Sequence, residues 1–194
     1  MPEQDAATVP GGFIANWLGP CVAGVLTLVI FHLSLLTTST PVSDHQSAVI
    51  ARTIADLEAK GFAREAFMLR NVVSFRNSDN WLNGVSGSEN AYASTNFPFF
   101  IVTVYPDFFE KATDDTERAM VLLHEAQHLR GRSERQAYAY VWRSRRQLGW
   151  TTLSHGTTPT FITIEQQTRD HAPELFTCPQ LVWNDCTETV VAKR

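Results

Sequence analysis

The sequence predicts an α+β fold, with one N-terminal transmembrane helix followed by a small domain of helices around a short β-sheet. Two observations lead to this prediction. A long segment near the N-terminus is apolar and free of charge, and the rest of the chain combines capped helical segments with one strongly β-forming run. With 194 residues, 44% of them apolar, the chain is long enough to bury a hydrophobic core.

The overall charge and the cysteine count exclude several classes of protein. The net charge is −4, so we expect no nucleic-acid partner. Three cysteines are too few for a disulfide scaffold or a cysteine-rich zinc module. A charged fraction of 19% with an ordinary apolar content also excludes a wholly disordered chain.

A charge-free segment predicts a membrane anchor. No Asp, Glu, Lys or Arg occurs between Asp5 and Asp44, and the 24 residues 13–36 (FIANWLGPCVAGVLTLVIFHLSLL) exceed the roughly 20 that cross a bilayer. We expect an N-terminal tail at 1–12, a single transmembrane helix in the lipid bilayer at 13–36, and a globular domain at 42–194. A buried core helix is the alternative. A cleavable signal peptide is disfavoured because the first residues, MPEQD, are acidic.

Two cysteines suggest the side of the membrane on which the domain lies. Cys178 and Cys186 are eight positions apart, with turn residues between them. A disulfide closing this small loop suits an oxidising compartment, whereas two buried free thiols are the alternative. The 15 residues after Leu36 hold no Lys or Arg that would retain them in the cytoplasm. We therefore expect a single-pass membrane protein with its main domain outside the cytoplasm.

The first part of the domain predicts two helices. Ser43 and Gln46 form a capping-box pair, which predicts a helix that ends before Gly61. Residues 62–69 predict a second helix by composition. Residues 71–75 (NVVSF) predict a strand or the end of that helix.

A loop and a pair of strands should follow. Residues 76–87 are rich in Asn, Ser and Gly, which predicts a loop. Short strands are predicted at 91–95 and at 99–105, where the second run is FFIVTVY, with a turn at 96–98. They form either a hairpin or an edge strand beside a central one.

The next two helices carry the clearest signals. A helix is predicted at 115–130, where Gly131 ends it, and another at 134–148. The final 45 residues are rich in Thr and in turns, with one strand candidate at 160–164 (TFITI). Six arginines between residues 130 and 146 predict a solvated helix face, with docking to anionic lipid or an acidic substrate as the alternative: Arg130, Arg132, Arg135, Arg143, Arg145 and Arg146.

The helix at 115–130 contains the motif HEAQH. Residues four apart share a helix face, so His124 and His128 can bind one metal ion through their ring nitrogens. Glu125 lies about 100° further round the helix, outside the ligand set but within reach of a metal-bound water. The motif therefore predicts a metal-dependent hydrolase in which Glu125 is the general base.

A third ligand is available six residues after the second histidine. Glu134 follows a turn at Gly131, in the run HEAQHLRGRSE, and its carboxylate can return to the same metal. Three protein ligands leave a fourth position open for water, as in catalytic zinc sites, so we expect one Zn²⁺ per chain. Glu165 is a weaker candidate for the third ligand. The alternative is that the two histidines are ordinary helix residues and that Glu134 only favours its helix N-terminus.

In these residues the sequence resembles the zincin metallopeptidases. The spacing HExxHxxGxxE is that of the metzincins with Glu in place of their third histidine, but no Met follows Glu134 to form their methionine turn. The pair Glu134 and Ala137 resembles the third-ligand helix of the gluzincins, although the gap after the second histidine is shorter here. Residues 90–104 also resemble the edge-strand hairpin of membrane-associated gluzincin endopeptidases. The resemblance covers about residues 88–145.

The resemblance implies a membrane-anchored zinc metallopeptidase acting on a peptide or protein substrate. His155, Tyr138 or Tyr140 could donate a hydrogen bond to the oxyanion formed during hydrolysis. Two other functions stay open. One is a non-catalytic, zinc-stabilised binding domain on a membrane tether, and the other is a zinc amidase acting on cell-wall material.

Overall fold

The computed structural model describes residues 12–86, 92–181 and 184–188, and side chains from Gly19 onwards except those of residues 85 and 86. The predicted tail at 1–12 lies almost entirely outside the described residues. The elements in chain order are α1 (Gly12–Thr37), α2 (Asp44–Ala59), α3 (Ala63–Asn71), β1 (Ser74–Arg76), α4 (Trp81–Ser86), β2 (Ala93–Asn96), β3 (Ile101–Val104), α5 (Pro106–Glu110), α6 (Asp115–His128), α7 (Glu134–Leu148), α8 (Thr152–His155), α9 (Pro159–His171) and the 3₁₀ helix η1 (Pro173–Phe176).

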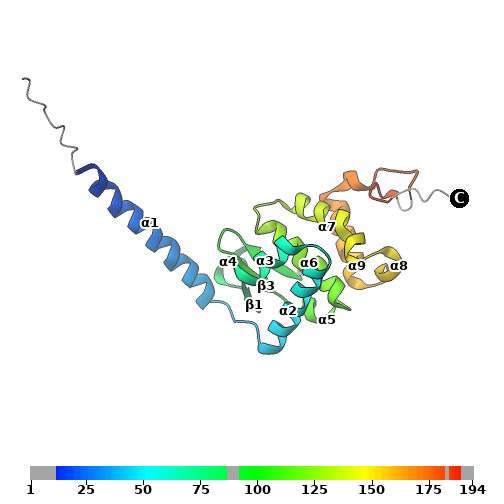
Figure 1. Cartoon of the computed structure of the whole chain (residues 1–194), viewed down its shortest axis with the longest axis horizontal. Helices are drawn as coiled ribbons and strands as arrows, with labels where there is room; N and C mark the ends of the chain where they lie inside the picture. The colour runs from blue at the N-terminus through cyan, green and yellow to red at the C-terminus, as the bar shows by residue number, and fades with distance from the viewer. Residues whose placement is uncertain (1–11, 87–91, 182–183, 189–194) are drawn as a thin grey trace, which may run out of the picture.

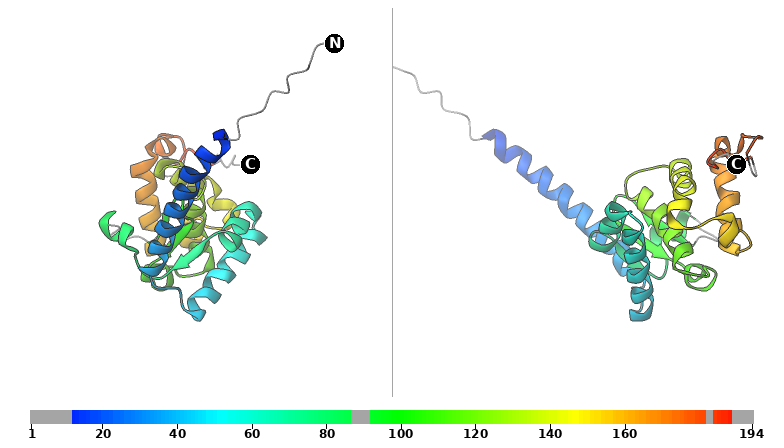
Figure 2. Two further views of the ribbon diagram at one scale, coloured as in Figure 1. Left: turned by 90° about the vertical axis from the view of Figure 1, so that its left-hand side faces the viewer. Right: turned by 45° about the vertical axis from the view of Figure 1, so that its right-hand side comes forward.

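The architecture is mixed α+β, mostly helical, with one small sheet, as expected. Helix α1 extends away from a folded domain that contains all the other elements, and α8 and α9 lie at the end of this domain opposite α1 (Figures 1 and 2). Within α1, Gly19–Thr37 is long and apolar enough to cross a membrane, with a mean hydropathy of 2.0. A signal sequence can have the same length and composition.

The sheet has the order β1-β3-β2 among the described strands. Strand β3 lies in the centre, parallel to β1 and antiparallel to β2, with Ser94 opposite Thr103. All four residues of β3 are buried, whereas β2 lies at an edge. This arrangement matches the predicted edge strand beside a central strand. Strand β3 begins later than predicted because Phe100 takes a left-handed conformation, with φ of 53°, in the turn before it.

Helix α6 is the centre of the core. It packs against α2, α3, α7 and strand β2. Apolar residues on both sides of the HEAQH histidines are buried: Ala119, Met120, Leu122, Leu123, Ala126 and Leu129. Asp114 caps the helix, because its side chain accepts the backbone N–H of Glu117 at 2.9 Å.

Two predicted elements were wrong. The strand candidate at 160–164 is part of helix α9, which begins after Thr158, whose hydroxyl accepts the N–H of Phe161, and has Pro159 at its first turn. The predicted loop at 76–87 contains the short helix α4, which Asn80 caps by accepting the N–H groups of Leu82 and Asn83. In both cases a local cap overrode the composition of the segment.

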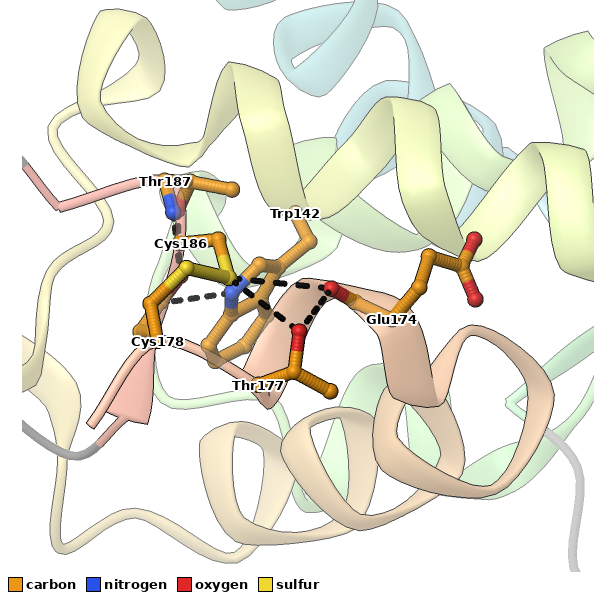
Figure 3. Close-up of a disulfide and its surroundings, with 7 residues drawn as sticks. Trp142, Glu174, Thr177, Cys178, Cys186 and Thr187 are labelled. Carbon is orange, nitrogen blue, oxygen red and sulfur yellow. Dashed lines mark hydrogen bonds between the residues drawn. A yellow bond between two sulfur atoms is a disulfide. The ribbon is translucent and has the colours of Figure 1, made fainter.

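A disulfide closes a loop within the C-terminal segment, and a buried ion pair fixes this segment to α7. Cys178 and Cys186 form a disulfide that lies beside Trp142 (Figure 3). Arg145 is 2% exposed and binds Asp185 at 2.6 Å. The prediction that all six arginines form a solvated face was therefore wrong for Arg145, because an acidic partner arrives from 40 residues further along the chain.

Candidate metal centre

The two histidines of α6 point at each other and at Glu134. Their Nε2 atoms lie 2.9 Å apart. The carboxylate oxygens of Glu134 lie 3.2 Å from Nε2 of His124 and 3.3 Å from Nε2 of His128. One ligand atom from each residue can be chosen so that all three lie within 4.8 Å of one another. The structure thus brings together the three side chains predicted as metal ligands.

A tight turn between α6 and α7 places Glu134. The N–H of Gly131 donates to the carbonyl of His128 at 2.8 Å, and the N–H of Arg132 donates to the carbonyl of Gln127 at 3.1 Å. This is the Schellman pattern of helix ends, and it needs the left-handed φ of 70° found at Gly131. Ser133 then caps α7, so Glu134 begins a new helix directly beside the end of the old one.

The same turn orients the ring of His128. Its Nδ1 lies 2.9 Å from the carbonyl oxygen of Arg132, which can only accept a hydrogen bond. A neutral His128 therefore carries its proton on Nδ1 and presents the lone pair of Nε2 to Glu134 and His124. Metal-binding histidines are usually held in this way by a backbone carbonyl or a carboxylate.

Ring packing orients His124 instead. Its ring centroid lies 4.3 Å from that of Tyr138, and its Nδ1 is buried with no hydrogen-bond partner among the described residues. Tyr138 stacks in turn on His171 of α9, at 5.0 Å between ring centroids. Its hydroxyl donates to Gln167 at 2.8 Å. Helices α6, α7 and α9 therefore all contribute to this wall of the site.

The charges of the three groups depend on one another. Burial lowers the pKa of His128, but the hydrogen bond to Glu134 and the charges of Glu125 and Glu134 raise it, to about 9 in total. Hydrogen bonds from His124 and His128 hold the pKa of Glu134 well below its usual range. An imidazole proton thus balances the carboxylate charge. A cation bound by the same atoms would take the place of that proton.

The donor set fits a divalent transition metal. Two imidazole nitrogens and one carboxylate oxygen are typical zinc ligands, and His₂Glu is a known catalytic ligand set. Two neutral imidazoles whose Nε2 lone pairs face each other across 2.9 Å need a proton or a cation between them. The residues present therefore fit a zinc ion.

Glu125 lies beside this cluster and not in it. Its side chain is buried, and Oε2 accepts a hydrogen bond of 2.7 Å from the hydroxyl of Thr95 on strand β2. Oε1 has no hydrogen-bond partner in the described part of the chain, so it is available to accept a proton. The sequence predicted the position of Glu125 on the helix, but Thr95 as its partner was not foreseen.

The cluster lies in a cleft of about 750 Å³. The cleft is lined by residues in or next to β2, in α6, in the turn at Gly131, in α7 and in α9: Tyr92, Ala93, Ser94, Thr95, Phe97, Met120, Val121, His124, Glu125, His128, Gly131, Arg132, Glu134, Tyr138, Val141, Ile164, Gln167 and His171. His171 and Gln167 were missed by the sequence reasoning. Their region was predicted to be turn-rich with one strand, so no helix face was available on which to group them.

Strand β2 offers a backbone edge to this cleft. The N–H of Tyr105 donates to the carbonyl of Tyr92 at 3.0 Å. Hydrogen-bonded pairs alternate in an antiparallel ladder, so the backbone groups of Ala93 and Thr95 point away from β3. Both residues line the cleft. An extended peptide can therefore pair with this edge as a further strand.

The weaker sequence candidates lie elsewhere. His155 contacts Asp114 at 2.9 Å and Ser154 at 2.7 Å, and it is not among the described residues that line the cleft. Tyr140 donates to Glu65 at 3.1 Å, and Glu165 pairs with Arg169 at 2.7 Å. Of the hydrogen-bond donors proposed for an oxyanion, only Tyr138 lines the cleft, and of the two proposed third ligands, only Glu134 does.

Comparison of the chain with family models, with curated proteins and with solved structures found no match. The chemistry of the site must therefore be inferred from its own geometry.

Proposed function

We propose that the protein is a membrane-anchored zinc metallopeptidase of the gluzincin type. The observation that carries the proposal is that the three metal ligands and the general base occupy separate positions at the site. His124, His128 and Glu134 converge within ligand distance of one point, while the buried Glu125 next to them is held by Thr95 and left out of the ligand set. A purely structural zinc site has no need for a buried carboxylate of this kind and normally has four protein ligands.

His124, His128 and Glu134 would hold the zinc ion. When bound, zinc lowers the pKa of a coordinated water and polarises a carbonyl group, the two effects needed for amide hydrolysis. Glu125 accepts a proton at Oε1 during attack and can return it to the leaving amine. Thr95 holds the other oxygen of Glu125, so that the proton-accepting oxygen keeps a fixed direction.

The walls of the cleft suit an extended peptide. The outward backbone groups of Ala93 and Thr95 would pair with the substrate main chain and align its carbonyl with Glu125. Tyr138 is a donor beside the metal ligands, because burial and the charges of Glu134 and Glu125 raise the pKa of its hydroxyl and keep it protonated. We assign it as the candidate donor to the oxyanion, to which its hydroxyl would turn from Gln167.

Two further features support a domain that is anchored in a membrane and lies outside the cytoplasm. The apolar helix α1, Gly12–Thr37, supplies an anchor of bilayer length. The disulfide between Cys178 and Cys186 suits an oxidising compartment.

Metal removal and replacement test the proposal. The full chain in detergent should contain one zinc per chain and hydrolyse members of a peptide library. A chelator should abolish hydrolysis, and zinc should restore it where magnesium does not.

His124→Ala and His128→Ala should lose the zinc, whereas His45→Ala, which changes an exposed histidine of α2, should keep it. Equal zinc content in all four proteins would refute the site. Zinc without hydrolysis would favour the binding-domain alternative, and cleavage of cell-wall amides alone would favour the amidase.

A further inference from the structure

The exposure of helix α1 changes abruptly along its length, at the point where the domain begins to pack against it. From Gly19 to Ile30 every residue is exposed, and Ile30 itself is 66% exposed. From Phe31 onwards the domain covers part of the helix, and Leu35 is fully buried. The helix from Gly12 to Ile30 is about 28 Å long at a rise of ~1.5 Å per residue, close to the ~30 Å hydrocarbon core of a bilayer. The domain therefore begins where the helix would leave the hydrocarbon.

No flexible spacer separates the helix from the domain. The ring of Phe31 lies 5.3 Å from that of Trp81 on α4 and 4.9 Å from that of Phe99 in the turn between β2 and β3. The indole N–H of Trp81 donates to the hydroxyl of Ser34 at 3.1 Å. Just after the helix, the carbonyl of Thr40 accepts the N–H of Asn77 at 2.8 Å. These contacts fix the domain at the end of the membrane helix, and α4 lies near this end of α1 in Figure 1.

Two exposed aromatic side chains belong to this junction. Trp81, which touches Phe31, is 43% exposed, and Phe97, two residues before Phe99, is 53% exposed. Trp and Tyr side chains are enriched at the level where membrane helices enter the headgroup layer. Phe is common on the apolar face of helices that lie in this layer. Phe97 also lines the cleft that holds the metal cluster.

A buried polar network ties the junction to the edge strand. Asn80, the cap of α4, donates to Asn96 of β2 at 2.7 Å, and Asn96 donates to Asn83 of α4 at 2.6 Å. Asn83 donates in turn to Thr103 of β3 at 3.2 Å. The position of Trp81 is thus fixed relative to the strand that carries Thr95. The cleft cannot move away from the membrane surface without breaking these contacts.

We propose that Trp81 and Phe97 rest in the interfacial layer of the bilayer from which α1 emerges and hold the mouth of the cleft at the membrane surface. The surface is a lipid-docking site, and its occupant is the headgroup region of the membrane that holds α1. A second consequence rests on the proposed function: the cleft takes a chain segment that lies beside the membrane, such as the juxtamembrane segment of a membrane-anchored protein.

Site-directed spin labelling tests the lipid contact. The full chain with Cys21→Ser is placed in nanodiscs of phosphatidylcholine with a minority of phosphatidylglycerol, and a nitroxide is attached at Phe97→Cys or at Leu153→Cys. Leu153 is the control, because it is 97% exposed on α8, at the end of the domain away from α1 (Figure 1). We expect dissolved oxygen to relax the label at position 97 more than a water-soluble nickel complex does, and the reverse at position 153. Equal access of nickel to both labels would overturn the proposal.

A second measurement does not depend on folding of the labelled variant. In a background of Trp17→Phe and Trp183→Phe, which leaves three of the five tryptophans, lipids brominated near the headgroup should quench part of the tryptophan fluorescence. Trp81→Phe should remove the larger part of that quenching, since Trp142 and Trp150 are buried in the domain. Unchanged quenching after Trp81→Phe would place this side chain away from the lipid and contradict the docking.

The proposal that the substrate is a chain segment beside the membrane has its own test. One peptide sequence is offered to the chain in liposomes, either free in solution or attached to the same liposomes through an acyl chain. We expect the anchored peptide to be hydrolysed about tenfold faster or more, as its effective concentration at the cleft requires. Trp81→Ser should reduce this ratio. Equal rates would refute the substrate class, whereas hydrolysis of neither peptide would count against the proposed function and leave the labelling results to decide the docking.

Discussion

The hydroxyl of Thr95 on edge strand β2 donates a hydrogen bond of 2.7 Å to Oε2 of Glu125 on helix α6. This contact joins the strand that would align a substrate to the carboxylate that would accept its proton. It explains why a buried carboxylate beside Glu134 and the histidines is not drawn into the ligand set. One oxygen of Glu125 is already engaged from the side of the substrate.

Thr95→Val should therefore impair catalysis without affecting metal binding. The side chain keeps its shape but loses the donor, so Glu125 loses its fixed direction. We expect kcat to fall about tenfold while zinc content stays at one per chain. Thr95→Ser, which keeps the hydroxyl, should recover most of the rate. If Val and Ser variants behave alike, the hydrogen bond has no role in positioning Glu125.

Gly131→Ala should separate backbone strain from its effect on the metal site. Gly131 has φ of 70°, and Gly149, which ends α7, has φ of 77°. An added Cβ costs about 1–2 kcal/mol in this region, so both alanine variants should unfold at lower denaturant concentration. Only Gly131→Ala should weaken zinc binding, because only that turn places Glu134. Equal zinc affinity in both variants would contradict this account of how Glu134 is positioned.

Much of the site follows from the sequence because its parts are close together in the chain. The spacing of His124, Glu125 and His128 fixes their places on one helix, and Gly131 marks the turn that returns Glu134. Thr95, His171 and Gln167 could not be predicted in the same way. Their contacts with the site depend on how β2 and α9 pack against α6 and α7, which local periodicity does not specify.

The same limit applies to the fold. The capping pair at Ser43 and the stop at Gly61 predicted helix ends that the structure contains. The TFITI run predicted a strand from its β-branched residues, yet it forms a helix because Thr158 caps it and Phe161 and Ile164 bury one face. Propensity alone gave the wrong element where a cap and tertiary packing favoured the other.

Loss of a buried acidic partner should destabilise the C-terminal segment. Asp185 accepts hydrogen bonds from Arg145 at 2.6 Å and from the indole of Trp142 at 2.9 Å, and it is almost fully buried. Asp185→Asn leaves the Arg145 charge poorly compensated, so we expect a loss of about 3 kcal/mol in the free energy of unfolding. Glu174→Gln, at an exposed pair with Arg135, should change it by less than about 1 kcal/mol. Similar midpoints in urea for the two variants would contradict the assignment.

Acid should remove a contribution that Asp115 makes to stability. The hydrogen bond from Arg52, followed by that from Arg118, lowers the pKa of Asp115 despite the opposing effect of partial burial. A carboxyl with a lowered pKa in the folded state stabilises the fold above its unfolded value, near pH ~4, and this contribution is lost as the pH falls through the folded value. Asp115→Asn should therefore lower stability at pH 7 and flatten its decline below pH ~4. A wild-type slope in the variant would contradict this prediction.

The most direct test of the central claim is a comparison of Glu125→Gln with Glu134→Gln in the zinc-loaded full chain. Glu125→Gln keeps the size of the side chain and removes the base, so zinc content should stay near wild type while peptide hydrolysis falls by ~10²–10⁴-fold. Glu134→Gln weakens the ligand set, so zinc affinity and hydrolysis should fall together. A Glu125→Gln protein that binds zinc and hydrolyses peptides at the wild-type rate would contradict the account.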